Sequence, residues 1–161
     1  MLILGHTGIT LGIFWFFEEK TGLKFDYRIV VMASLFPDII DKPLGMVVLP
    51  LNNGRIIGHT LLFALILLFL GTLQKNSTTL SVGSLFHMVE DEMWADPVTL
   101  FWPFLGNFPE EEYESLYEYA RTIATEYIPS PSRTFIFEVV GAIILVLFLV
   151  KRKKVSLSQH T

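Results

Sequence analysis

The sequence predicts an all-α protein: a multi-pass transmembrane helical bundle of about five membrane segments with one amphipathic surface helix. Composition is the first reason, because 52% of the residues are hydrophobic and 17% are charged, against about 25% charged residues in an ordinary soluble domain. The second reason is that long apolar stretches alternate with short polar connections. Cysteine is absent, which excludes disulfides and thiolate chemistry, and the net charge of −4 argues against nucleic acid as a partner.

The five apolar segments are, in chain order, 2–17, 29–40, 56–73, 80–94 and 134–150. Only the third and the fifth approach the roughly 20 residues that a helix needs to cross the hydrocarbon core. The shorter segments could be buried helices of a soluble protein, but that alternative does not account for the two long ones. The first segment lacks the basic start and the cleavage site of a signal peptide. Within it, Gly8 and Gly12 form a G-x-x-x-G pair that would let another helix approach closely.

Two different pieces follow the fourth segment. Residues 94–106, "WADPVTLFWPFLG", contain two tryptophans and two prolines, which indicates an irregular, interface-level or re-entrant stretch. Residues 107–131 predict an extramembrane amphipathic helix that begins near Pro109 and ends at "IPSPS". Its glutamates lie mainly opposite its aromatic residues, and this acidic face makes it a poor binder of anionic lipid headgroups.

The basic residues predict the orientation of the chain. The run "KRKK" at 151–154 directly follows the last apolar segment and is typical of a cytoplasmic flank. With five crossings the N-terminus then lies outside, and eight of the 12 Lys and Arg residues lie inside. The sequence therefore predicts a single membrane domain over 1–161 in the cell membrane, with site-bearing helices in 1–106, the extramembrane helix in 107–131, a C-terminal membrane helix in 132–150 and a cytoplasmic polar tail in 151–161.

Histidine and aspartate residues gather at the outer, non-cytoplasmic end of four of the predicted segments. These residues are His6, Asp38, Asp41, His59, His87 and Asp91. Imidazole nitrogens and carboxylate oxygens are the ligands of Zn²⁺ and similar transition metals, and a bound cation offsets the cost of placing acids near lipid. The pattern therefore predicts a divalent metal site, with zinc the favoured ion. The roles of Glu90 and Glu92 stay open between supporting the ligands, acting as a general base and facing solvent.

Four motifs carry a resemblance to a known family. They are "GHT" (5–7), "FPDIIDKP" (36–43), "GRIIGHTLL" (54–62) and "GSLFHMVEDEMWADPVTLFWPF" (83–104). In this order they resemble the motif series of the YdjM-type membrane-bound metal-dependent hydrolases. The resemblance implies that the six histidines and aspartates above are the metal-site positions. That family is distantly similar to zinc-dependent phospholipase C and S1/P1-type nucleases, which implies phosphoester hydrolysis. The chain departs from the series at its acidic pair, which has one extra residue, and at Gly54, which replaces a histidine.

The expected function is that of a metal-dependent hydrolase acting on a phosphoester of a lipid or of a substrate delivered at the interface. His87 and Asp91 would anchor the ion, and Arg55 would hold an anionic phosphate by a forked hydrogen bond. One alternative is a membrane transport protein for ions or metals, because intramembrane Asp and His residues also mark ion pathways. A pathway needs polar groups at several depths, however, and the third and fifth segments have none in their middle or inner halves. The other alternative is a metal-stabilised membrane protein without turnover.

Overall fold

The computed structural model describes residues 1–49, 51–110, 116–127 and 132–158, and this part of the chain is helical without any strand. The predicted all-α class is therefore confirmed for the described residues. The helices are α1 (Ile3–Thr21), α2 (Tyr27–Pro43), α3 (Leu61–Gly71), α4 (Lys75–Glu90), α5 (Pro97–Leu100), α6 (Leu116–Thr122) and α7 (Arg133–Ser158). Two 3₁₀ turns, Ile57–His59 and Met93–Ala95, and two π-helical turns, Leu44–Val48 and Ile123–Tyr127, complete the elements.

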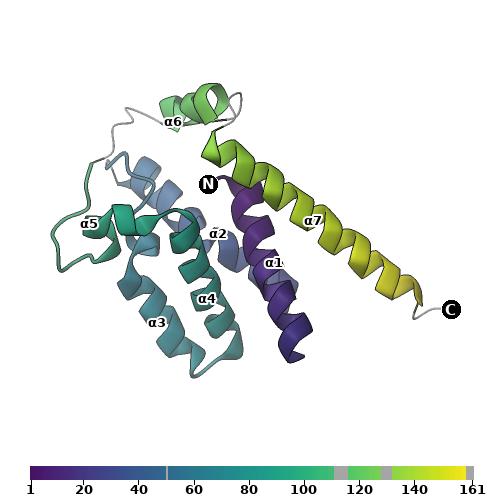
Figure 1. The fold of residues 1–161 in the computed structure, drawn as a ribbon. Coiled ribbons are helices and arrows are strands. Elements are labelled where there is room, and N and C mark those ends of the chain that lie inside the picture. Colours follow the sequence, from purple (N-terminus) through teal and green to yellow (C-terminus); the bar gives the residue numbers. More distant parts are fainter. Residues whose placement is uncertain (50, 111–115, 128–131, 159–161) are drawn as a thin grey trace.

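The helices pack around α2 and α4. Helix α2 lies against α1 and α4, while α3 folds back along α4, and α7 runs beside α1 (Figure 1). One buried apolar cluster joins α1, α2 and α7 through Leu11, Phe14, Val30 and Phe148. These contacts fix the relative positions of the helices that bear the polar residues.

Helices α1 and α7 cross in close contact at small residues. A Cβ atom added to Gly8 would lie 2.1 Å from the carbonyl oxygen of Gly141, so only glycine fits there. One turn nearer the start of α1, the Glu138 carboxylate accepts hydrogen bonds of 2.8–3.0 Å from the amides of Leu2, Leu4 and Gly5. The first amides of a helix have no carbonyl partner within the helix, and negative charge is favourable at this end. The close helix approach predicted from Gly8 is therefore confirmed, with α7 as the partner.

The third predicted segment is not one continuous helix. Its first residues form the 3₁₀ turn Ile57–His59, and α3 begins only at Leu61, after Thr60 accepts a hydrogen bond from the Phe63 amide. The buried Asp41 carboxylate accepts hydrogen bonds from the amides of the stretch before α3 and ties that stretch to α2. Helix α3 has 11 residues, fewer than the predicted segment.

Among the described residues, one helix is long and apolar enough to cross a membrane, at Arg133–Lys153 in α7. Helix α3 is apolar but shorter. Both expose large apolar side chains, including Leu65 and Phe69 on α3 and Ile143 and Leu147 on α7. Exposed apolar surface of this extent is unusual on a soluble monomer and normally meets lipid or another protein.

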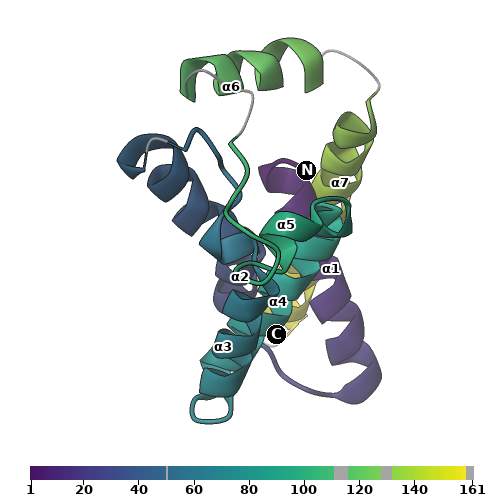
Figure 2. The same cartoon turned by 90° about the vertical axis from the view of Figure 1, so that its left-hand side faces the viewer.

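The residues after α4 agree with the irregular stretch predicted for 94–106. They contain a 3₁₀ turn, the four-residue α5 and a series of turns. Helix α6 and the π-helical turn after it lie across the end of the bundle at which α1 and α7 begin (Figures 1 and 2). The predicted helix in 107–131 is confirmed over 116–127. Pro109 itself is not helical, and residues 111–115 and 128–131 lie outside the described part of the chain.

Candidate metal centre

Five side chains from four elements converge beneath α6. Two overlapping groups can each place three ligand atoms within 4.8 Å of one another, and both include His87. The five residues are His6 on α1, Asp38 on α2, His59 before α3, and His87 and Asp91 at the end of α4. The three histidines are fully buried, and the two aspartate side chains are 14% and 6% exposed.

His59 is oriented by Asp41. Its ring Nδ1 lies 2.7 Å from Asp41 Oδ2, and the same carboxylate accepts hydrogen bonds from the backbone amides of Ile56, Gly58 and His59 at 2.7–3.1 Å. Because the carboxylate oxygens accept all three amide hydrogens, they also accept from the ring, and Nδ1 of His59 donates the fourth hydrogen bond. The lone pair of Nε2 is then directed away from Asp41, toward the other histidines.

His87 is oriented by the backbone of α2. Its Nδ1 lies 2.7 Å from the carbonyl oxygen of Ser34, and because a carbonyl can only accept, Nδ1 must carry the hydrogen. The ring is fully buried and stacks on His6 with 4.0 Å between the ring centroids. As with His59, the neutral His87 ring presents its Nε2 lone pair to the cluster.

The Nε2 atoms of His59 and His87 lie 3.1 Å apart. Two lone pairs that face each other at this distance repel, whereas a cation bound by both removes the repulsion. Two nitrogens bound to one tetrahedral zinc at about 2.0 Å lie about 3.3 Å apart. The separation of the two rings therefore fits a shared transition-metal ion.

His6 repeats the arrangement on α1. Its Nδ1 lies 2.7 Å from Glu90 Oε2, and the other oxygen of Glu90 accepts a hydrogen bond of 2.9 Å from Thr10. Its Nε2 is buried 3.1 Å from Asp91 Oδ1 and makes no hydrogen bond with any described residue. A buried ring nitrogen normally has a partner, and metal-binding histidines typically give their second nitrogen to a carboxylate or carbonyl. All three rings have this arrangement.

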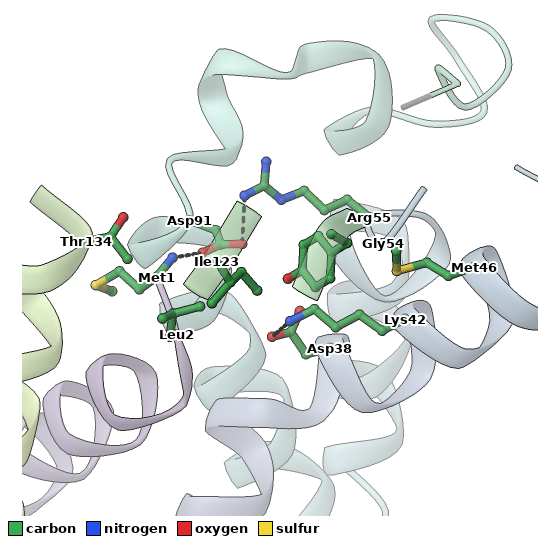
Figure 3. A pocket seen from close by; sticks show the side chains of 11 residues that line it. Met1, Leu2, Asp38, Lys42, Met46, Gly54, Arg55, Asp91, Ile123 and Thr134 are labelled. Atoms are coloured by element: carbon green, nitrogen blue, oxygen red, sulfur yellow. Dashed lines mark hydrogen bonds and ion pairs between the residues drawn. The ribbon is translucent and has the colours of Figure 1, made fainter. Parts of the chain in front are cut away.

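Asp38 and Asp91 each have an oxygen near the histidine nitrogens. Asp38 Oδ1 lies 3.7 Å from the Nε2 of His59, and Asp91 Oδ2 lies 3.8 Å from the same atom. Each carboxylate also contacts cations: Asp38 pairs with Lys42 at 2.6 Å, while Asp91 contacts Arg55 at 3.2 Å and the amino group of Met1 at 2.7 Å (Figure 3). The nitrogen and oxygen donors together suit Zn²⁺ or a similar divalent transition metal.

Of the six predicted ligands, the structure brings five together and places Asp41 behind His59. Asp41 is fully buried, and its hydrogen bonds to three amides and one imidazole occupy its oxygens. The ambiguity between Asp38 and Asp41 in the lengthened acidic pair is therefore decided by geometry: Asp38 faces the cluster, and Asp41 orients a histidine. Arg55, predicted to hold phosphate, lies at the edge of the cluster beside Asp91.

Of the two glutamates whose roles stay open in the sequence, Glu90 orients His6, whereas Glu92 is half-exposed and pairs with Arg133 at 2.5 Å. Sequence reasoning missed two further supporting residues. Thr10 and Lys42 were not considered at all. Both follow a site residue by four positions in a helix, His6 and Asp38 respectively, and this spacing is the signal that could have found them.

Comparison with known proteins gives one result. The model of a family described as YdjM inner membrane protein matches residues 1–155. Searches of curated proteins and of solved structures returned no match. The family match covers all of the residues in the histidine and aspartate cluster.

Proposed function

This chain belongs to the YdjM inner membrane protein family, and we propose that its cluster is the active site of a membrane-bound metal-dependent hydrolase. The observation that carries the proposal is the convergence of three buried imidazoles, each held at Nδ1 by an oxygen acceptor. Such pre-oriented rings favour a resident cation. The substrate class we propose is a phosphoester of a lipid or of a molecule delivered at the membrane interface.

His59, His87, His6, Asp38 and Asp91 would hold the ion. When bound there, a divalent transition metal would supply an activated water at neutral pH and polarisation of the scissile group. Hydrolysis forms a new bond from the water oxygen to phosphorus and breaks the bond to the ester oxygen, which leaves as an alcohol with a proton from water.

The chain's own residues prepare this reaction. Asp41 and Glu90 fix the tautomers of two ligand rings, and the burial of all three rings excludes water from their sides. Arg55 is 41% exposed and contacts the ligand Asp91, so its guanidinium can reach a phosphate oxygen that approaches the ion.

We further propose that the chain crosses the membrane five times, with the cluster toward the non-cytoplasmic side. The exposed apolar faces of α3 and α7 support this placement, because lipid would cover them. The cluster includes His6 near the start of α1, and Figure 1 shows that α1 and α7 begin at the same end of the bundle, whereas the basic C-terminal part of α7 lies at its other end. A phosphoester headgroup at the interface would then meet the cluster without entering the hydrocarbon.

The test is a metal and activity measurement on purified protein in detergent. Wild-type protein should contain near-stoichiometric zinc or a similar ion and should cleave at least one member of a panel of phospholipids, prenyl phosphates and chromogenic phosphoesters. His87→Ala should lose most of the metal and all of the turnover, and His160→Ala, which alters a histidine of the C-terminal tail, should change neither. If the protein binds metal but hydrolyses none of these substrates between pH 5 and 9, the hydrolase proposal is refuted and a transport or structural role is favoured.

A further inference from the structure

A cavity of about 210 Å³ opens beside the histidine cluster and beneath α6. Its charged side chains are those of Asp38, Asp91, Lys42 and Arg55, whereas Leu2 and Ile123 add apolar surface (Figure 3). Two of the five converging side chains, those of Asp38 and Asp91, line this cavity, so a ligand inside it would contact the candidate metal site.

Both cationic side chains are held by carboxylates of the candidate metal site. Lys42 Nζ lies 2.6 Å from Asp38 Oδ2, whereas the other oxygen of Asp38 is the one that faces the histidine nitrogens. Arg55 contacts Asp91 at 3.2 Å. Each cation thus lies one carboxylate away from the candidate ion, on a separate helix or loop. A phosphate group bound to the ion by one oxygen could therefore direct its other oxygens toward these cations.

The charges of the cavity favour an anion of more than one charge. Lys42 and Arg55 formally cancel Asp38 and Asp91, and the amino group of Met1 adds a further positive charge, so a divalent metal ion leaves an excess of positive charge in the cavity. The acids that orient the histidines, Asp41 and Glu90, do not line the cavity. A phosphomonoester carries about −1.5 to −2 at pH 7 on three terminal oxygens, whereas a phosphodiester carries a single charge on two.

We propose that Lys42 and Arg55 form a two-cation cradle for the terminal phosphate of a phosphomonoester, and that Lys42 selects this group over a phosphodiester. This inference rests on the proposed function and narrows its substrate class. Arg55 offers a planar fork to two oxygens, and Lys42 offers a point charge to a third. The third terminal oxygen is the one that a diester lacks, because it has become an ester oxygen.

Lys42 is held in place for this role by its surroundings. Its ammonium lies 5.7 Å from the centroid of the Tyr119 ring on α6, over the ring face, and its side chain is 33% exposed. A lysine anchored between a carboxylate and an aromatic ring has lost much of its side-chain freedom before the ligand arrives. Binding therefore costs less conformational entropy than it would with a solvated lysine.

The test measures binding, not turnover. Zinc-loaded full-length protein in detergent is titrated calorimetrically with methyl phosphate and with dimethyl phosphate. We expect methyl phosphate to bind about tenfold more tightly or better, as one charge-assisted hydrogen bond would provide. The proposed cradle is refuted by the wild-type protein alone if methyl phosphate and dimethyl phosphate bind with equal affinity, or if methyl phosphate does not bind.

Variants then assign the selectivity to Lys42. Lys42→Met should weaken methyl phosphate binding about tenfold and leave dimethyl phosphate nearly unchanged, and Lys42→Arg should restore the preference. Lys24→Met is the matched control, because Lys24 is 82% exposed and pairs with Glu18 far from the cavity. Zinc content is measured for every variant. An unchanged preference in zinc-loaded Lys42→Met would refute the role of Lys42.

Two further ligands identify the source of the phosphate. Phosphatidic acid in mixed micelles and glycerol 3-phosphate in solution present the same terminal group. Tighter binding of either one supports the cradle and identifies its source, while binding of neither overturns it. If monoesters bind but no phosphoester is hydrolysed, the proposed hydrolase activity is refuted and the cradle is supported. If phosphoesters are hydrolysed with a preference for diesters, the activity is supported and the cradle is refuted.

Discussion

Replacement of Asp41 by Asn tests whether this residue orients His59 or binds the metal. Asp41 Oδ2 accepts from the amides of Ile56 and His59 and from His59 Nδ1, and Oδ1 accepts from the amide of Gly58 at 2.7 Å. An asparagine has one acceptor oxygen. In its better orientation this oxygen keeps the three partners of Oδ2, and the amide nitrogen then opposes the Gly58 amide hydrogen.

The expected loss of stability follows from these hydrogen bonds. One hydrogen bond to a charged group contributes about 1.5–3 kcal/mol, and an unsatisfied buried donor costs a similar amount. The remaining three bonds also lose their charge, so we expect Asp41→Asn to destabilise the protein by about 3 kcal/mol. For a chain of this length such a loss lowers the unfolding midpoint by roughly 6–12 °C. Loss of an orienting carboxylate should weaken metal affinity about 10–100-fold without abolishing it.

The measurements are thermal unfolding and zinc titration of purified protein in detergent. Asp26→Asn is the matched control, because Asp26 caps the start of α2 with a single hydrogen bond of 2.9 Å to the Arg28 amide at an exposed position. Asp38→Asn is the comparison for a metal-facing carboxylate and should lose more zinc than Asp41→Asn. The reasoning is refuted if Asp41→Asn unfolds like Asp26→Asn, or if it loses zinc as completely as Asp38→Asn.

The remaining predictions concern topology and helix packing. Reporter fusions after residues 76 and 160 should both be cytoplasmic and a fusion after residue 108 should not; a cytoplasmic reporter at 108 would reverse the orientation and place the cluster on the other side. Gly8→Ala should destabilise the protein by about 1–3 kcal/mol in an unfolding assay, because its Cβ would lie 2.1 Å from a backbone oxygen of α7. Gly12→Ala should cost less, since its Cβ would lie 2.9 Å from the Cγ2 methyl group of Ile144, a side-chain atom, and not against the backbone of α7. Equal effects of the two alanines would argue against the α1–α7 crossing.

The sequence by itself determined the helical class and most of the residues of the cluster. Apolar segments and their flanks predicted the helices, and Gly8 predicted a close helix contact. His6, Asp38, His59, His87 and Asp91 could be named because histidine and aspartate are rare in apolar segments, and because they recur at the same end of each segment. The order of the residues along the chain contains this information without reference to distance.

Only the tertiary structure decided which role each polar residue takes. Asp38 and Asp41 are three residues apart and equivalent in sequence, yet one faces the cluster and the other binds the loop before α3. Likewise Glu90 supports His6 from a different helix, across 84 residues of chain. Hydrogen-bond direction and the position of a ring nitrogen depend on atoms brought together by packing between helices, and neither spacing nor hydropathy along the chain contains those distances.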